Sequence, residues 1–191
     1  MNWEVVKAIL TVTFMSNIFI IDNLINKKNI DNIYQSLINT PSWCISRGSV
    51  PNNNNGMFPG LEIFSNNNSH NPFWHGYFLN LFESLNEKFF QQNKFYLPSN
   101  VKRIVLGAKN NNSITDFHID EHNQSNGWTI VGFLTPEWRS DWGGALQVEN
   151  QTIDFLPGRF VIFKVNTIHN GFGSNKEIPY WRISINYNIT D

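Results

Sequence analysis

Residues 155–170 read Phe-Leu-Pro-Gly-Arg-Phe-Val-Ile-Phe-Lys-Val-Asn-Thr-Ile-His-Asn, which combines a turn, a strand and a histidine within 16 residues. Pro157 and Gly158 mark a turn, and the β-branched and aromatic run 159–165 that follows predicts a strand. His169 comes just after the end of that strand. The stretch therefore predicts a short strand that delivers a histidine to one edge of a sheet.

The same pattern of strand-forming runs and turn residues continues through the C-terminal half of the chain. Short runs of β-branched and aromatic residues alternate with Asn, Gly and Pro, and few helices separate them, which favours antiparallel sheets. Two such sheets packed face to face predict a double-stranded β-helix, or jelly roll. The runs that predict strands are 101–108, 128–134, 145–148, 152–155, 159–165 and 181–189.

Two segments of the N-terminal half show helical spacing of apolar residues. The first covers 29–39, with Asn29 as the expected N-cap, and the second covers 72–92, with Asn71 as N-cap and Pro72 in the first turn. The Asn-rich stretches 51–56 and 66–69 lie between them and are expected to be loops, with a role as a lid left open. The chain is thus expected to be mostly β with supporting N-terminal helices.

Length and charge limit the possible partners. The chain has 191 residues with 14 Lys and Arg against 15 Asp and Glu, a size that suggests one domain. Residues 17–191 are expected to form it, after an N-terminal extension over 1–16. The net charge of −1 and the absence of a basic block disfavour nucleic acid as a partner.

Localisation follows from two features of the sequence. The single cysteine, Cys44, cannot form an intrachain disulfide, which favours a reducing compartment. The apolar run in residues 1–14 is too short to span a bilayer and has no basic start. We therefore expect a cytoplasmic protein without a membrane partner; the oligomeric state stays open.

Three side chains form a candidate metal site. His118 and Asp120 are two residues apart, so on a strand edge both would point to the same face. His169 follows 49 residues after Asp120. Two imidazoles and one carboxylate on one face of an ion are the facial triad of non-haem Fe(II) enzymes. A lone His-x-Asp is common by chance, and a surface role for His118 is the alternative.

A second candidate site lies 13 residues beyond His169. Arg182 and Ser184 share one face of the predicted strand 181–189. A guanidinium beside a hydroxyl is suited to binding a carboxylate. The alternative is an outward-facing arginine that forms a salt bridge on an edge strand.

Four ordered motifs together resemble the Fe(II)/2-oxoglutarate-dependent oxygenases, in particular the prolyl-hydroxylase-like branch. The resemblance covers about residues 17–189. It rests on Phe117-His-Ile-Asp120, on Trp142-Gly-Gly-Ala-Leu146, on Phe155-Leu-Pro-Gly-Arg-Phe-Val-Ile-Phe163 leading to His169, and on Arg182-x-Ser184.

This resemblance implies that the protein is an enzyme and that different residues bind the metal and the co-substrate. His118, Asp120 and His169 would hold Fe(II), and Arg182, assisted by Ser184, would bind the distal carboxylate of 2-oxoglutarate. The reaction would consume O2, hydroxylate a C–H bond and release succinate and CO2, with ascorbate as a stimulant. The carboxylate at position 120 favours hydroxylation over halogenation, because related halogenases carry a small residue there.

Several other polar and aromatic residues could lie near this site. Flanking the triad are Asp116, Glu121 and His122, for which solvation is favoured over a role in orienting ligands. His70 and His75 are expected outside it, and Arg139 and Asp141 carry no motif. At most two of four tryptophans are expected to touch a substrate: Trp128, Trp138, Trp142 and Trp181.

The substrate stays open between a peptidyl residue, such as proline, and a small molecule. Two other classes of protein also fit the motifs. One is a cupin-like metalloenzyme that does not use 2-oxoglutarate, and the other is a non-catalytic binding or sensing module with a vestigial triad.

Overall fold

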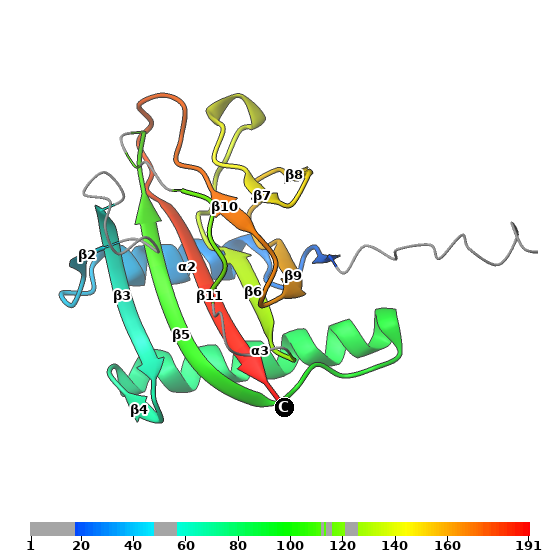
Figure 1. Ribbon diagram of the computed structural model, residues 1–191. Coiled ribbons are helices and arrows are strands. Elements are labelled where there is room, and N and C mark those ends of the chain that lie inside the picture. The colour runs from blue at the N-terminus through cyan, green and yellow to red at the C-terminus, as the bar shows by residue number, and fades with distance from the viewer. Residues whose placement is uncertain (1–17, 48–56, 112, 114–115, 121–125) are drawn as a thin grey trace, which may run out of the picture.

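The computed structural model describes residues 18–47, 57–111, 113, 116–120 and 126–191. The expected extension over 1–16 and the expected loop over 51–56 lie outside these ranges. The described residues form two sheets and two long helices (Figure 1). This arrangement confirms a mostly β fold.

The large sheet is antiparallel throughout and joins strands that are distant in sequence. Its central strand β11 pairs with β5 on one side and with β6 on the other. A short strand β4 (Asn68–Ser69) pairs with β3 outside the main order. In spatial order the strands are β1 (Phe19–Ile21), β9 (Phe160–Lys164), β6 (Trp128–Phe133), β11 (Arg182–Thr190), β5 (Asn100–Lys109), β3 (Met57–Ser65) and β2 (Cys44–Arg47).

A small sheet packs on one face of the large one. It consists of β10 (His169–Gly171), β7 (Leu146–Val148) and β8 (Gln151–Ile153). Apolar side chains from both sheets form a compact cluster between them, which explains why the two sheets stay together. Its buried members are Val131, Phe133, Leu146, Val148, Ile153, Phe155, Val161 and Phe163. Two facing sheets with these crossovers are a jelly roll, as the sequence predicts.

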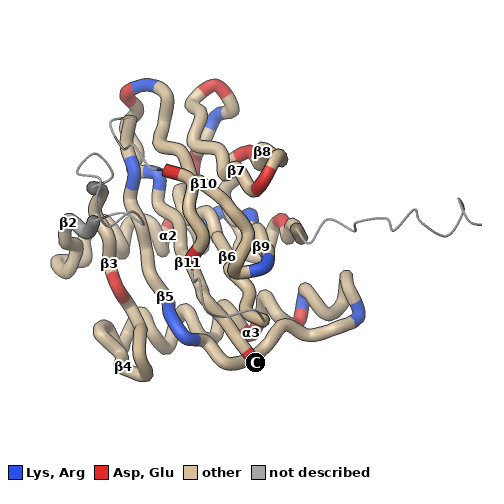
Figure 2. Tube along the Cα trace, viewed as in Figure 1, with Lys and Arg blue, Asp and Glu red and all other residues tan. Residues whose placement is uncertain are grey.

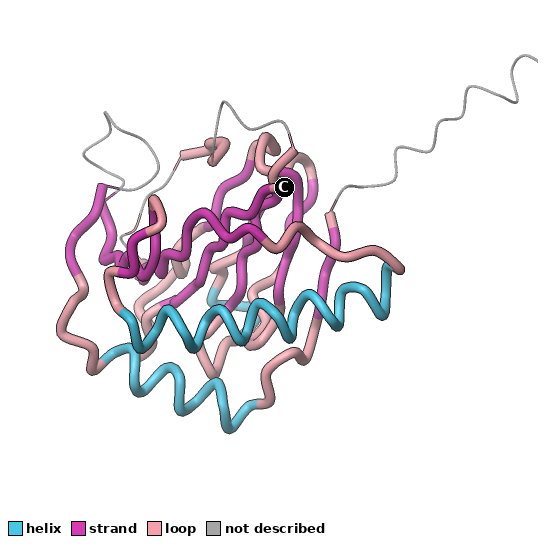
Figure 3. Tube along the Cα trace, turned by 90° about the horizontal axis from the view of Figure 1, so that it is seen from below, coloured by secondary structure: helices cyan, strands magenta, loops and turns pink. Residues whose placement is uncertain are grey.

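Helices α2 (Lys27–Ile38) and α3 (Pro72–Asn93) cover the opposite face of the large sheet (Figure 3). Their buried faces and the underside of the sheet form the main core. Asn71 caps α3 as predicted. The N-cap of α2 is Asn26 and not Asn29, because Asn26 is extended and its side chain accepts from the Asn29 amide. Among the described residues no helix is long and apolar enough to cross a membrane.

Local details differ from the sequence prediction in the first half of the chain. Strand β3 was not predicted, and the stretch 66–69 is a tight hairpin rather than an open loop. Asn66 and Asn67 both have positive φ angles, 50° and 61°, between the paired residues Ser65 and Asn68. Asparagine tolerates this conformation, and two such residues make a hairpin turn that suits the twist of the strands.

Candidate active site

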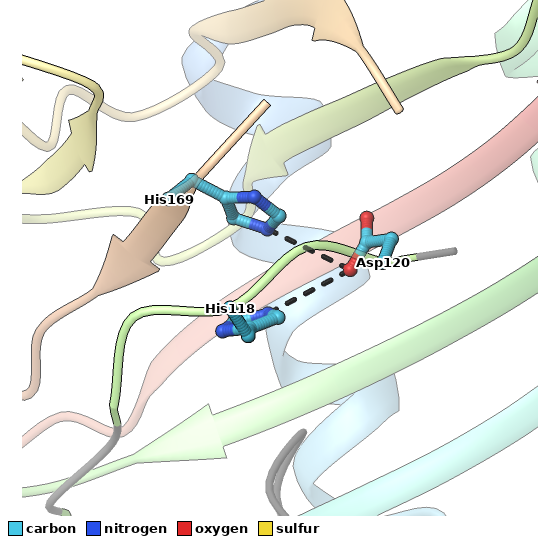
Figure 4. A group of neighbouring side chains, drawn as sticks. All are labelled: His118, Asp120 and His169. Carbon is cyan, nitrogen blue, oxygen red and sulfur yellow. Dashed lines mark ion pairs between the residues drawn. The ribbon is translucent and has the colours of Figure 1, made fainter. Parts of the chain in front are cut away.

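Three predicted ligands converge where the two sheets meet. A short antiparallel bridge joins the backbone of His118 to that of His169, and Asp120 follows two residues after His118. Oδ1 of Asp120 lies 3.6 Å from Nε2 of each histidine (Figure 4). All three donor atoms lie within 4.8 Å of one another. Donors on one octahedral ion stand about 3 Å apart when the bonds are about 2.1 Å long, so the group fits a single cation.

Backbone carbonyls orient both imidazoles. Nδ1 of His118 donates to the carbonyl oxygen of Asp116, and Nδ1 of His169 donates to that of Thr167, each at 3.0 Å. A carbonyl can only accept, so Nδ1 carries the proton and Nε2 offers its lone pair to the ion. Burial also lowers the pKa of His169, which keeps this ring neutral and able to bind a metal.

The outer oxygen of Asp120 is held by two side chains. The Thr129 hydroxyl donates to Oδ2 at 2.7 Å and the Asn188 amide donates to it at 3.1 Å. These contacts turn Oδ1 toward the two histidines. Neither residue was predicted from the sequence, although Asn188 continues the two-residue alternation that begins at Arg182 and Ser184.

A cavity of about 270 Å³ extends from this group along β11 and β5. Alternation on β11 places Arg182, Ser184, Asn186 and Asn188 on the cavity side, while Ile183, Ile185, Tyr187 and Ile189 enter the main core. The cavity therefore has a polar floor on an apolar support, and it contains both candidate sites.

Arg182 lies at one end of this cavity and is only 1% exposed. Its Nε donates to the carbonyl oxygen of Gly144 at 2.7 Å, and its Nη2 has no hydrogen-bond partner among the described residues. Burial lowers the pKa of Arg182 to about 9. The outward-facing alternative is therefore wrong, and a buried guanidinium with an unused donor fits an anion such as a carboxylate.

Gly144 makes this contact possible through its backbone. Its φ is +76°, and a Cβ there would stand 2.5 Å from Cζ2 of Trp138. Only glycine fits such a position without strain. The Trp142-Gly-Gly motif thus shapes the loop that receives Arg182.

Lys109 is a further cavity residue that the sequence analysis did not find. It ends β5, directly opposite Arg182 on β11, and is 7% exposed. Its Nζ donates to the carbonyl oxygen of Gly171. Burial, and then the charge of Arg182, lower the pKa of Lys109 well below its usual value.

The remaining candidates lie elsewhere or outside the described residues. His70 contacts the Ser65 hydroxyl and His75 stacks on Phe64, away from the triad. Asp141 pairs with Arg139 and Lys176 on the surface. None of the four tryptophans is among the described residues that line the cavity. Glu121 and His122 fall outside the described ranges, whereas Asp116 orients His118 through its carbonyl.

Comparison with known proteins connects this geometry to a family. The sequence model of the 2OG-Fe(II) oxygenase superfamily matches residues 105–190. No curated protein matches the chain in sequence. The matched residues include every described residue lining the cavity except Phe58 and Arg103.

Solved structures of this superfamily share the fold. A Trichoplax adhaerens prolyl hydroxylase in complex with a hypoxia inducible factor peptide has a TM-score of 0.64 at 16% identity, over 93% of this chain and 84% of that one. The viral collagen prolyl hydroxylase of Paramecium bursaria Chlorella virus-1, in its 2OG complex, has a TM-score of 0.63 at 13% identity, over 94% and 99%.

A third solved structure, a 2OG-Fe(II) oxygenase family oxidoreductase from Burkholderia pseudomallei, has a TM-score of 0.67 at 12% identity, over 90% of this chain and 84% of that one. Fe(II), 2-oxoglutarate and O2 are the cofactor and co-substrates of the superfamily. Residues 105–190 therefore match the 2OG-Fe(II) oxygenase superfamily, and the described chain has the fold of the prolyl hydroxylases.

Proposed function

We propose that the chain hydroxylates a C–H bond of a peptidyl residue or a small molecule, while 2-oxoglutarate is decarboxylated to succinate and CO2. The observation that carries this proposal is one cavity shared by the His-Asp-His group and a buried arginine whose Nη2 has no partner in the part of the chain that the structure describes. A metal site alone would fit many reactions. An anion site at the far end of the same cavity fits a co-substrate with a distal carboxylate.

Each residue has a defined role in this proposal. His118, Asp120 and His169 hold Fe(II), which activates O2 when it is bound together with 2-oxoglutarate. Arg182 binds the distal carboxylate and so orients the co-substrate. Ser184 lies between Arg182 and the triad on the cavity side of β11 and offers a further hydroxyl. Residues 17–191 form the functional domain, and we place it in the cytoplasm.

The cavity size and the relatives support the proposed substrate class. About 270 Å³ is at the small end of ligand pockets, so one side chain or a small molecule reaches the metal. One structural relative was solved with a peptide and another is named a collagen prolyl hydroxylase. Peptides with an exposed proline are therefore the first substrates to test, followed by free amino acids.

Succinate formation tests the proposal. With Fe(II), ascorbate, O2 and 2-oxoglutarate, the wild type should form succinate, and a true substrate should stimulate this and gain one oxygen atom by mass. Arg182→Met should reduce 2-oxoglutarate turnover strongly while metal affinity stays unchanged. Arg139→Met, which removes a surface arginine, should behave as wild type.

Two outcomes would contradict the proposal. Full turnover without 2-oxoglutarate would indicate the cupin-like alternative. Absence of succinate from the iron-loaded protein, across both peptide and amino acid panels, would indicate a binding or sensing module.

A further inference from the structure

Lys109 and Arg182 bring two cationic groups to one end of the cavity. They are directly paired across β5 and β11, and both side chains are buried (Figure 2 shows the basic positions in blue). This end lines the same cavity as the triad, and the Arg182 guanidinium lies 5.4 Å from the Phe133 ring centroid and 5.0 Å from that of Phe155. The pair therefore belongs to the cavity, with the apolar cluster between the sheets behind Arg182.

The Lys109 ammonium and the Arg182 guanidinium both lie close to Gly171. A Cβ built on Gly171 would stand 3.5 Å from Nζ of Lys109 and 3.5 Å from Nη2 of Arg182. The two nitrogens are therefore within about 7 Å of each other. A carboxylate has two oxygens, and donors this close can each serve one of them.

The bonding of Arg182 leaves a place for a second donor. Its Nε is already used by the Gly144 carbonyl, so a carboxylate cannot use the Nε and Nη2 edge of the guanidinium. Within the described ranges, Nη2 is the Arg182 donor that has no hydrogen-bond partner. Lys109, on the neighbouring strand, supplies a charged donor beside it.

The energetics favour an anion at this position. Two buried cations lose hydration and repel each other, and both effects lower the pKa of Lys109. A bound carboxylate offsets both costs by pairing with the two charges. The site is thus better satisfied with an anionic ligand than without one.

We propose that Lys109 and Arg182 together bind the distal carboxylate of 2-oxoglutarate, with Lys109 as a second anchor that sets the specificity for a dicarboxylate. This inference rests on the proposed use of 2-oxoglutarate. It adds a residue that the sequence motifs did not include.

Binding of two matched ligands tests the inference. The ligands are 2-oxoglutarate and 2-oxopentanoate, which has the same carbon chain with a methyl group in place of the distal carboxylate. Their affinities for the anaerobic Fe(II) protein are measured by calorimetry in the wild type and in Lys109→Met, Lys109→Arg and Lys102→Met. Lys102 is on the same strand and is not among the cavity-lining residues, so its variant is the matched control.

Lys109→Met should weaken 2-oxoglutarate binding by about 10- to 100-fold, the effect of one lost charged hydrogen bond. Its affinity for 2-oxopentanoate and for Fe(II) should equal that of the wild type. Lys109→Arg should recover most of the loss, and Lys102→Met should show none.

Two results would overturn the inference: unchanged 2-oxoglutarate affinity in Lys109→Met, or an equal loss for both ligands. If Lys109→Met does not fold, Lys109→Gln takes its place under the same criteria. Failure of the proposed function gives a different pattern, because the wild type would then bind 2-oxoglutarate no better than 2-oxopentanoate.

Discussion

The side-chain amide of Asn188 donates to Oδ2 of Asp120 at 3.1 Å, across 68 residues of sequence. The Thr129 hydroxyl reaches the same oxygen, and the amide of Asn188 lies 3.4 Å from that hydroxyl. The carboxylate is thus fixed by two neighbouring strands, β6 and β11, before any ion binds. Such contacts orient a ligand and raise its affinity for metal.

Asn188→Ala and Thr129→Val should each weaken Fe(II) binding by about 10-fold, because Asp120 loses a contact that orients it. Anaerobic metal titration of the apoprotein measures this. Asn186→Ala is the control, since Asn186 lies on the same face of β11 and the described hydrogen bonds to Asp120 come from Thr129 and Asn188. Unchanged metal affinity in both test variants would refute a positioning role.

Gly144→Ala should destabilise the protein by about 1–3 kcal/mol, because φ of +76° and the Trp138 ring both exclude a Cβ. Its carbonyl oxygen accepts from Arg182, so affinity for 2-oxoglutarate should also fall. Urea denaturation measures the change in unfolding free energy, and titration with 2-oxoglutarate measures the change in affinity.

Gly76→Ala is the matched control for that substitution. Gly76 lies inside α3, and a Cβ there meets nothing within 4 Å. Alanine should therefore stabilise the helix by about 0.5–1 kcal/mol. Equal effects of the two substitutions would contradict the role assigned to Gly144.

Asp22→Asn should destabilise the protein by about 1 kcal/mol at neutral pH, because Asp22 binds Arg159 through both oxygens, at 2.7 and 2.9 Å. The hydrogen bond with Arg159 lowers the pKa of Asp22 below 3.8. The contribution is therefore complete above pH 3.8 and is lost as pH falls through the lower folded-state pKa.

Denaturation of the wild type and of Asp22→Asn across a pH series tests whether the stabilising contribution of Asp22 is lost as the pH falls. The difference in unfolding free energy should be constant at neutral pH and shrink in acid. A difference that grows as pH falls would contradict the assignment.

The sequence predicted the parts of the site that depend on local spacing. Alternation with a period of two is a backbone property, so His118 with Asp120 and Arg182 with Ser184 could be assigned to common faces. The strong helix 72–92 and the central strands were predictable for the same reason. The spacing of apolar residues within each of these elements is enough to predict its type.

Other parts depend on pairing between distant segments. Strand β3 contains Pro59 and Gly60, which disfavour a strand locally, and it forms because β5 and β2 pair with it. Strand β10 has only three residues and is defined by its pairing with β7. Lys109 gains its position from its register with Arg182. No local pattern in the sequence specifies these partners.

The most direct test of the account is anaerobic titration of the Fe(II)-loaded protein with 2-oxoglutarate, followed by visible absorption. The account predicts a charge-transfer band in the wild type, no band in His169→Ala, and a band that needs much more 2-oxoglutarate in Arg182→Met. A wild type that binds Fe(II) and develops no band at saturating 2-oxoglutarate would contradict the shared metal and co-substrate site.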